Sequence, residues 1–226
     1  MKIIKPHFEI LTRVHGMEVL KMLELAGRTC YKSEDRITDT SAVDFVRMIL
    51  SRGHESVIEH FSISVKAVCD RGVSHEIVRH RIASYAQEST RYCNYSKSKF
   101  GSQLTFIQPS WCLEDWTKYS PEELDDILRD EPAHPDHIWL KAMKTAENCY
   151  FQLLEAGRSP EEARAVLPNS LKTEIVMTMN LREWRHFFRM RTSAASHPQM
   201  REIAVPLLEA FKGMIPVVFD DIIPEK

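Results

Sequence analysis

Thirteen residues near the middle of the chain, from Arg79 to Arg91, contain three arginines, one histidine and one glutamine. Arginine presents a planar fork of donors that matches phosphate and carboxylate oxygens two at a time. Few folds need such a segment for stability, so its first interpretation is an anion-binding wall. The alternative interpretation is a solvated basic face or a surface network of ion pairs.

Length and composition describe an ordinary globular protein. At 226 residues the chain suits one large domain or two small ones, and 43% hydrophobic residues are enough to bury a sizeable core. A formal net charge of -2 argues against a dedicated nucleic-acid binder, whose domain is usually strongly basic. Any anion site must therefore be a local concentration of positive charge.

The sequence predicts a cytoplasmic protein without a membrane partner. No apolar run approaches the roughly 20 residues of a membrane span, and the segment Met1 to Pro6 lacks the apolar region of a signal peptide. The five cysteines are odd in number and scattered, which favours reduced thiols. No Cys-x-x-Cys pair occurs, so we expect no metal site.

Hydrophobic periodicity predicts intermixed helices and strands in the first half of the chain. Apolar residues at helical spacing over 17–26 indicate a helix that ends near Gly27, and a second helix is predicted over 41–52. From 61 to 69 the apolar residues alternate, as in a half-buried strand. Ser74 is predicted to cap a short helix that delivers the arginine-rich run at its end.

The second half is predicted to be mostly helical. Residues 94–135 are expected to form loops around one strand and one helix, because prolines interrupt them. Ser159-Pro160 is predicted to cap a helix, and Pro206 to kink or divide the last one. The other predicted elements are a strand over 104–108, helices over 122–128 and 138–156, a strand over 173–179, and helices over 180–191 and from 198 onward.

Several motifs of this chain occur in the same order and with the same spacing as in the flavin-dependent thymidylate synthases, a family that the chain therefore resembles. The central one is Arg79-His80-Arg81 followed by Ser84 and then Ser89-x-Arg91. The others are His54-Glu55-Ser56 with Glu59-His60, Arg164 to Pro168, Asn180-Leu181-Arg182, and Arg191.

This resemblance implies a fold and an assembly. The family has an α+β fold with a curved mixed β-sheet flanked by helices. It forms a homotetramer whose active sites lie at subunit junctions. We therefore expect residues 1–226 to form a single domain of this kind, with shared active sites.

The resemblance also implies a reaction, a reductive methylation of dUMP to dTMP. The methylene group of 5,10-methylenetetrahydrofolate passes to C5 of dUMP, and reduced FAD supplies the hydride that completes the methyl group. NADPH then restores the reduced flavin. The expected partners are thus small molecules and further copies of the chain, with no nucleic acid.

Side chains must hold the flavin if it binds. Only seven glycines occur, and none forms the Gly-x-Gly-x-x-Gly loop that holds a pyrophosphate in Rossmann folds. Matching positions assign to the flavin Ser56, Arg79, His80, Arg81, Gln87, Asn180, Leu181, Arg182 and His186, with His54 near the flavin ring and the folate. They assign to dUMP Glu76, Arg79, Gln87, Glu88, Ser89, Thr90, Arg91, Arg164 and Arg191.

Arg191 is the predicted catalytic residue. Attack from C5 requires electron density to move from N3 into the uracil ring, and a guanidinium at N3 or O4 stabilises the charge that develops there. The alternative is that Arg191 only pairs with Glu174 or Glu202. Ser89 is assigned to phosphate binding, since no base is predicted beside it. Glu76 departs from the glutamine of some relatives, and a carboxylate beside a phosphate would need pairing with Arg79.

Two other function classes remain open at this point. One is a nucleic-acid-binding module in which Tyr85, Tyr92 and Tyr95 stack on bases. The other is a flavoprotein of different specificity, which would show no spectral response to dUMP. Colour separates the first from an enzyme, because only a flavoprotein purifies yellow.

Overall fold

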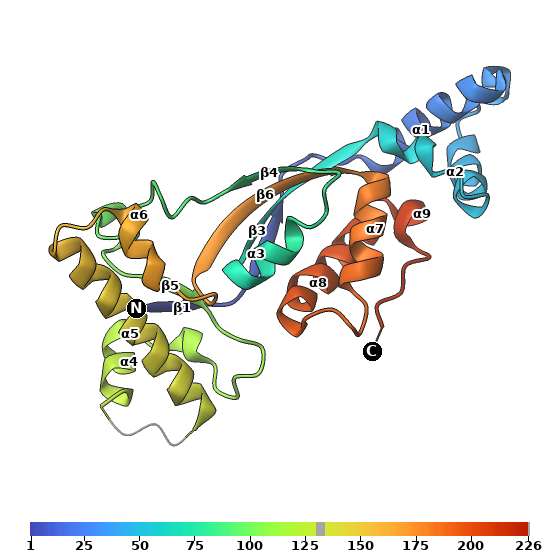
Figure 1. Cartoon of the computed structure of the whole chain (residues 1–226). Helices are drawn as coiled ribbons and strands as arrows, with labels where there is room; N and C mark the ends of the chain where they lie inside the picture. Colours follow the sequence, from blue (N-terminus) through green and yellow to red (C-terminus); the bar gives the residue numbers. More distant parts are fainter. Residues whose placement is uncertain (130–133, 226) are drawn as a thin grey trace. The chain divides into compact units, whose positions relative to one another are not determined.

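The computed structural model of the chain, shown in Figure 1, describes residues 1–129 and 134–225. The chain divides into two compact units whose sequence segments alternate. Unit 1 consists of Met1–His7, Val68–Val78 and Ala86–Ile175, and unit 2 consists of Phe8–Ala67, Arg79–Tyr85 and Val176–Lys226.

A four-stranded sheet contains the two long strands that the sequence predicts. Alternate residues of β6 are buried, so side chains such as Ile175 and Met177 face the core. The strands predicted over 61–69 and 173–179 are confirmed to within one residue at each end. The strand order is β2 (His7–Ile10), β3 (Ser62–Asp70), β6 (Lys172–Asn180) and β4 (Ser84–Gln87). Together with the helices, this sheet makes the chain an α+β protein, as predicted.

Helices dominate unit 2, and an aromatic cluster forms its core. Trp184 donates its indole N–H to the carbonyl of Ile63 at 3.0 Å. Its ring lies 4.9 Å from that of Phe211 and 5.6 Å from that of Phe188, between centroids. The helical segments are α1 (Gly16–Tyr31), η1 (Glu34–Arg36), α2 (Ser41–Ser51), η2 (Glu55–His60), α7 (Leu181–Arg191), α8 (Pro198–Met214) and α9 (Pro216–Phe219).

The first helix is longer than predicted, because Gly27 does not end it. Helix α1 continues to Tyr31. The next residue, Lys32, is its C-cap and adopts the left-handed conformation with φ 48°. A Cβ atom at Gly27 would lie 2.6 Å from Cε1 of Phe45. Gly27 therefore allows α1 to pack closely on α2, and the prediction that it stops the helix is wrong.

Helix α8 passes through Pro206 without being divided. Proline in a helix interior costs about 3 kcal/mol because it removes one hydrogen bond and crowds the preceding turn. Fully buried apolar residues on both sides, Ile203, Leu207 and Leu208, offset that cost. Pro206 was predicted to kink or divide this helix, and the helix is not divided.

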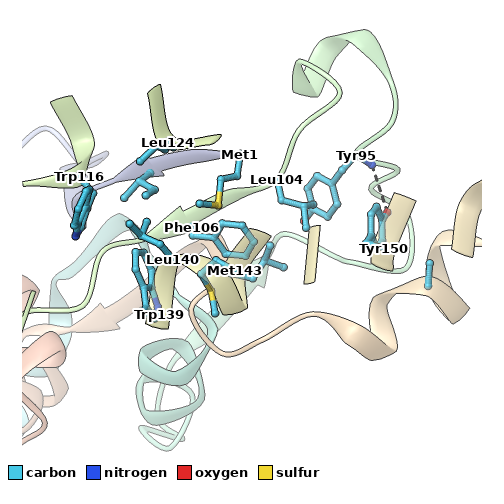
Figure 2. Packing of buried hydrophobic residues seen from close by; sticks show 13 residues of the cluster. Met1, Tyr95, Leu104, Phe106, Trp116, Leu124, Trp139, Leu140, Met143 and Tyr150 are labelled. Atoms are coloured by element: carbon cyan, nitrogen blue, oxygen red, sulfur yellow. Dashed lines mark hydrogen bonds between the residues drawn. The ribbon is translucent and has the colours of Figure 1, made fainter. Parts of the chain in front are cut away.

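Unit 1 contains a small parallel pair of strands and a separate hydrophobic core. Strand β1 (Lys2–Ile4) pairs with β5 (Thr105–Ile107), with Ile3 opposite Phe106. Figure 2 shows Phe106 and the neighbouring side chains of this core, in which the Tyr150 hydroxyl accepts from the backbone N–H of Tyr95 at 3.5 Å. The helical segments are α3 (Arg71–Ile77), η3 (Ser98–Phe100), η4 (Trp116–Lys118), α4 (Pro121–Ile127), α5 (Pro135–Glu155), α6 (Pro160–Ala163) and η5 (Arg164–Val166).

Most of the predicted elements of unit 1 are confirmed. Ser159 forms the capping box with Glu162 that the sequence predicts, although α6 is only four residues long. Helices α4 and α5 and strand β5 match the predictions over 122–128, 138–156 and 104–108. Within the loop prediction over 94–135, residues 130–133 lie outside the described part of the chain.

The helix before the arginine-rich run begins earlier than predicted. Asp70 caps it, because its Oδ1 accepts from the backbone N–H of Val73 at 2.7 Å. Ser74 lies inside the helix, where its hydroxyl donates to the carbonyl of Arg71 at 2.9 Å. The prediction of Ser74 as the cap is wrong, but the helix does end at Ile77, two residues before Arg79.

The five cysteines are free thiols, which confirms the prediction of no disulfide framework. Among the described residues, no helix combines the length and apolar character that a membrane span requires.

Candidate active site

The N-terminal end of α7 in unit 2 borders a cavity of about 480 Å³. Asn180 defines this end, because its Oδ1 accepts from the backbone N–H of Glu183 at 2.9 Å. Three residues assigned to the flavin by resemblance, Asn180, Arg182 and His186, therefore lie together around one cavity. The cavity is lined by Glu55, Glu59, Ile82, Asn180, Arg182, Glu183, His186 and Arg189.

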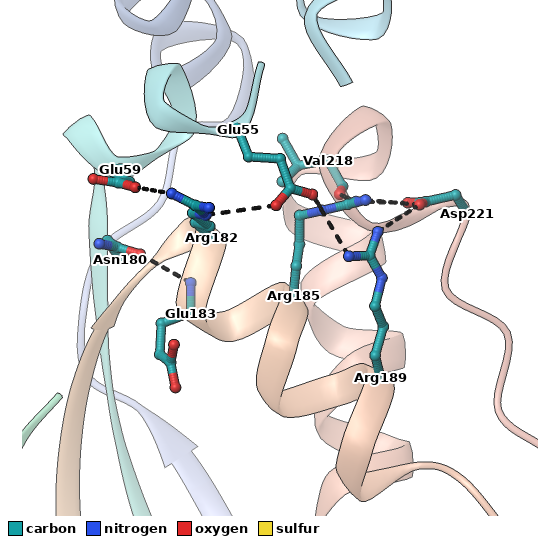
Figure 3. A network of polar contacts seen from close by, with 9 residues as sticks. All are labelled: Glu55, Glu59, Asn180, Arg182, Glu183, Arg185, Arg189, Val218 and Asp221. Atoms are coloured by element: carbon teal, nitrogen blue, oxygen red, sulfur yellow. Dashed lines mark hydrogen bonds and ion pairs between the residues drawn. The ribbon is translucent and has the colours of Figure 1, made fainter. Parts of the chain in front are cut away.

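Glutamates of η2 pair with the arginines of α7, as Figure 3 shows. Nη1 of Arg182 lies 2.6 Å from Glu59, and Glu55 lies 3.5 Å from both Arg182 and Arg189. The side chains of Arg182 and Arg189 are about half exposed, at 52% and 48%. Exposed pairs of this kind contribute little free energy, so a phosphate can displace the carboxylates from these arginines.

The buried Arg185 fastens the C-terminal segment to the same helix (Figure 3). Its two terminal nitrogens donate to the two carboxylate oxygens of Asp221 at 2.6 and 2.7 Å, and Nη1 also donates to the carbonyl of Val218. Such a bidentate pair restricts both side chains. Arg185 therefore has a structural role. By contrast, the half-exposed arginines Arg182 and Arg189 of α7 can contact a ligand.

His80 connects Glu183 to Arg191 inside unit 2. Its Nδ1 lies 3.2 Å from Oε1 of Glu183, and its Nε2 lies 3.0 Å from the Nε of Arg191, which donates. His80 is only 4% exposed and Glu183 only 7%. Burial, helped by the charge of Arg191 and the nearby His186, lowers the pKa of His80 to about 4, so the ring is neutral at physiological pH. Burial raises the pKa of Glu183.

Side-chain atoms of His80, Glu183 and His186 lie within 4.8 Å of one another, close enough to surround a metal ion. The chemistry of the cluster opposes this. Nε2 of His80 already accepts from Arg191, so the proton of the neutral ring occupies Nδ1, which faces Glu183 and cannot then coordinate a cation. The guanidinium beside the ring adds electrostatic repulsion. We derive no metal site from this cluster.

Arg79 and Arg81 flank His80 and have exposed side chains. Within residues 1–129 and 134–225, neither guanidinium has a carboxylate partner or a hydrogen bond. Two unpaired guanidiniums separated by a single residue are unusual for a structural network of ion pairs, and their donors match the oxygens of an anionic ligand. These two residues therefore do not form the ion-pair network of the alternative interpretation, whereas a solvated basic face stays open as the other alternative.

His54 and Ser56 lie at the start of η2 in unit 2, and both are exposed. The hydroxyl of Tyr31 is 2.9 Å from Nδ1 of His54. The other ring nitrogen has no hydrogen bond within the structure described. Leu181 differs from the other predicted flavin residues because its side chain is fully buried and its backbone N–H already donates to the carbonyl of Phe61 at 3.0 Å.

Unit 1 brings together the residues that follow the arginine-rich turn. Gln87 donates from its amide nitrogen to the hydroxyls of Ser74 and Thr173, at 2.9 and 3.2 Å. Glu88 accepts from the hydroxyl of Tyr95 and from Lys172, each at 3.0 Å. Glu88, Tyr95 and Lys172 line a second cavity of about 480 Å³.

The predicted phosphate residues also lie in unit 1. The hydroxyl of Thr90, which is buried, accepts from Nη1 of Arg164 at 3.4 Å. Ser89 accepts from the backbone N–H of Arg91 at 3.2 Å. The guanidinium of Arg91 is exposed and pairs with Glu161 at 3.0 Å. Each of these arginines belongs to a polar surface, where a phosphate can reach it.

The predicted residues are thus divided between the two units. His54, Ser56, Arg79, His80, Arg81, Asn180, Leu181, Arg182, His186 and Arg191 belong to unit 2, and Glu76, Gln87, Glu88, Ser89, Thr90, Arg91 and Arg164 belong to unit 1. Sequence reasoning did not assign roles to Glu183 or Lys172, and it considered Tyr95 only as a base-stacking residue of the alternative nucleic-acid-binding module. Glu183 follows the Asn180 cap by three residues, the spacing of a capping box, which is the pattern that singles it out. Tyr95 and Lys172 have no comparable pattern.

Comparison with known proteins identifies relatives along nearly the whole chain. The profile of the family described as "Thymidylate synthase complementing protein" matches residues 14–217. The flavin-dependent thymidylate synthase of Geobacter sulfurreducens is 32% identical over 87% of this chain and 79% of its own length. That of Corynebacterium efficiens is 35% identical over 93% of this chain and 81% of its own length.

A solved structure has the same fold. The UMP/dUMP methylase PolB from Streptomyces cacaoi, crystallised with 5-Br UMP, superposes with a TM-score of 0.71 at 22% sequence identity. The alignment covers 97% of this chain and 95% of PolB.

Proposed function

The chain belongs to the family of flavin-dependent thymidylate synthases, and we propose that residues mainly of unit 2 hold its FAD, that residues mainly of unit 1 hold the phosphate of its dUMP, and that Arg79 and Arg191 of unit 2 also bind dUMP. The reaction of this family is the reductive methylation of dUMP to dTMP with 5,10-methylenetetrahydrofolate. NADPH is the proposed source of reducing equivalents. The observation that most directly supports this assignment is the pair of exposed, unpaired guanidiniums of Arg79 and Arg81, one on each side of the buried His80.

The donors of unit 2 fit FAD. Arg79 and Arg81 offer free guanidiniums, and Arg182 offers one that pairs with the exposed Glu59 and the half-buried Glu55. Together they match the pyrophosphate, a role that glycine-rich loops fill in other folds. Asn180, His186 and Ser56 add polar contacts, and Ile82, which is 70% exposed, adds an apolar one. When bound and reduced, the flavin supplies the hydride of the reaction.

Arg191 is proposed to act on the pyrimidine. Its Nε is hydrogen-bonded to His80, so the orientation of its guanidinium is restricted. A guanidinium held at N3 or O4 of uracil stabilises negative charge on the ring as C5 attacks the methylene carbon. We expect Arg191→Ala to lower dTMP formation by about 10²–10³-fold while FAD remains bound. Loss of FAD together with activity would contradict this role.

The phosphate of dUMP is proposed to lie against Ser89, Thr90, Arg91 and Arg164. Hydroxyl groups and guanidiniums are the donors that a dianionic phosphate prefers. Arg79 extends this set, and Gln87, Glu88 and Glu76 are assigned to the sugar and base. A carboxylate near a phosphate is repulsive, so we expect Glu76 and Glu88 to face away from it.

A homotetramer of single-domain subunits with shared sites is proposed from the family. Arg91→Ala and Arg191→Ala proteins test it after unfolding and refolding together. If the two arginines reach one dUMP from different subunits, hybrid sites with both arginines form and recover part of the activity. Mixed oligomers that form but make no dTMP would show that both arginines belong to one chain.

Anaerobic turnover tests the reaction itself. The protein is supplied with dUMP, methylenetetrahydrofolate, FAD and NADPH, and dTMP is measured; parallel reactions omit one component each. We expect no dTMP when dUMP, methylenetetrahydrofolate or NADPH is omitted, and none without added FAD when the protein has first been freed of bound flavin. A yellow protein that makes no dTMP and shows no spectral response to dUMP would be a flavoprotein of another specificity. A colourless protein that co-purifies with nucleic acid would be a nucleic-acid-binding module.

A further inference from the structure

The hydrogen bond from Arg191 shows which ring nitrogen of His80 carries the proton in the structure. The Nε–H of a guanidinium only donates, so Nε2 of His80, which lies 3.0 Å away, must present its lone pair. The neutral ring then has its proton on Nδ1, which faces Oε1 of Glu183 at 3.2 Å. The opposite tautomer would direct two N–H groups at each other on the Arg191 side and leave the carboxylate without a donor.

The surroundings of His80 hold the ring in this position. Its ring lies 4.9 Å from that of Phe187, between centroids, and the hydroxyl of Tyr85 donates to its carbonyl at 2.7 Å. The backbone of Glu183 is itself held by the Asn180 cap. Both neighbours of the ring come from α7, eight residues apart, so His80 connects the first turn of this helix to its last residue.

We propose that Glu183 and His80 are positioning residues for Arg191: the carboxylate keeps His80 in the Nδ1–H tautomer, and the imidazole holds the guanidinium in the orientation that meets the pyrimidine. The proposal rests on the proposed function, in which Arg191 contacts dUMP. It also changes the role assigned to His80 by resemblance. With both ring nitrogens engaged, the imidazole is not a hydrogen-bonding ligand of FAD.

The consequence of losing this support follows from geometry. A displacement of about 1 Å in a group that acts on the substrate can lower the rate by about 10²-fold. Without Glu183, either tautomer of His80 is available, and one of the two repels the Nε–H of Arg191. The effect of Glu183 must therefore reach the substrate through His80 and Arg191.

The wild-type protein provides the first test. Nitrogen-15 NMR of histidine-labelled protein at neutral pH distinguishes a nitrogen that bears a proton from one that does not. The His80 signals are identified by their absence in His80→Asn. We expect a protonated Nδ1 and an unprotonated Nε2. A protonated Nε2 would overturn the proposal, and this result does not depend on any Glu183 variant folding.

Two variants of Glu183 provide the second test. Glu183→Leu removes the acceptor, and we expect its kcat to fall by about 10-fold or more, with His80 present as mixed tautomers and with FAD content unchanged. Glu183→Gln keeps an oxygen that accepts from Nδ1–H and should recover most of the lost rate. Wild-type kcat in Glu183→Leu would overturn the proposal, as would a loss of FAD that accounts for the loss of rate.

A double-mutant cycle separates positioning from a general structural effect. We expect Glu183→Leu to weaken dUMP binding in the wild-type background but to leave it unchanged in the Arg191→Ala background. Equal weakening in both backgrounds would overturn the proposal. Failure of the proposed function would give a different result, whatever the tautomer of His80. The wild-type protein would then form no dTMP, or Arg191→Ala would bind dUMP as well as the wild-type protein does.

Discussion

Replacing Glu161 with Gln tests whether Arg91 binds the phosphate of dUMP. In the structure Oε2 of Glu161 accepts from the Nε of Arg91 at 3.0 Å, and the two side chains are 54% and 51% exposed. A phosphate that uses the same guanidinium must compete with this carboxylate. Removing the charge of Glu161 should therefore strengthen dUMP binding.

The expected size follows from the exposure of the pair. Exposed ion pairs contribute about 0.2–1 kcal/mol, which corresponds to a decrease of about 1.4- to 5-fold in the Kd of dUMP. Because salt screens exposed charges, the gain should shrink as the ionic strength rises.

Isothermal titration calorimetry with dUMP measures this effect at two salt concentrations. Glu155→Gln is the matched control, because Glu155 is an exposed glutamate of unit 1 with no ion-pair partner in the described chain. An unchanged or higher Kd in Glu161→Gln would remove Arg91 from the phosphate site.

Three further predictions concern the flavin, the core and the response to acid. Arg79→Ala and Arg81→Ala should each weaken FAD binding by about 1.5–3 kcal/mol, the contribution of a hydrogen bond to a charged group; an unchanged Kd in a fluorescence titration would contradict that role. Trp184→Ala should lower the free energy of unfolding in denaturant by about 3–5 kcal/mol, whereas Trp184→Phe should lose only about 1–3 kcal/mol, because it mainly leaves the buried carbonyl of Ile63 without its donor. Between pH 6.5 and about 4, His80 is protonated in the unfolded chain but not in the native chain. The free energy of unfolding should therefore fall as the pH falls. At pH 5 this fall should be about 1–2 kcal/mol larger in the wild-type protein than in His80→Asn. Parallel pH curves for the two proteins would contradict this.

Local patterns in the sequence predicted the elements that depend on neighbouring residues alone. The alternation over 61–69 requires only that one face of a strand is buried, and β3 confirms it. The cap at Ser159 depends on a glutamate three residues later, and it is present. The prediction of Ser74 as the cap of α3 was wrong, because Asp70, four residues earlier, accepts from the backbone N–H of Val73.

Contacts between distant segments could not be predicted from such patterns. Gly27 would end an isolated helix, but a ring from α2 occupies the space where its side chain would lie. His80 was assigned to the flavin from its place in a motif, without its partners. Those partners are 103 and 111 residues away along the chain, so only the folded structure brings them to its two ring nitrogens.

A single-turnover experiment tests the central claim, that this chain methylates dUMP with reduced FAD as the hydride donor. The FAD-loaded protein is reduced without oxygen, freed of excess reductant, and mixed with dUMP and methylenetetrahydrofolate in the absence of NADPH. The account predicts that oxidised flavin absorbance returns as dTMP forms, in equal amounts and on the same time course. Oxidation of the flavin without dTMP, or dTMP formed while the flavin stays reduced, would contradict it.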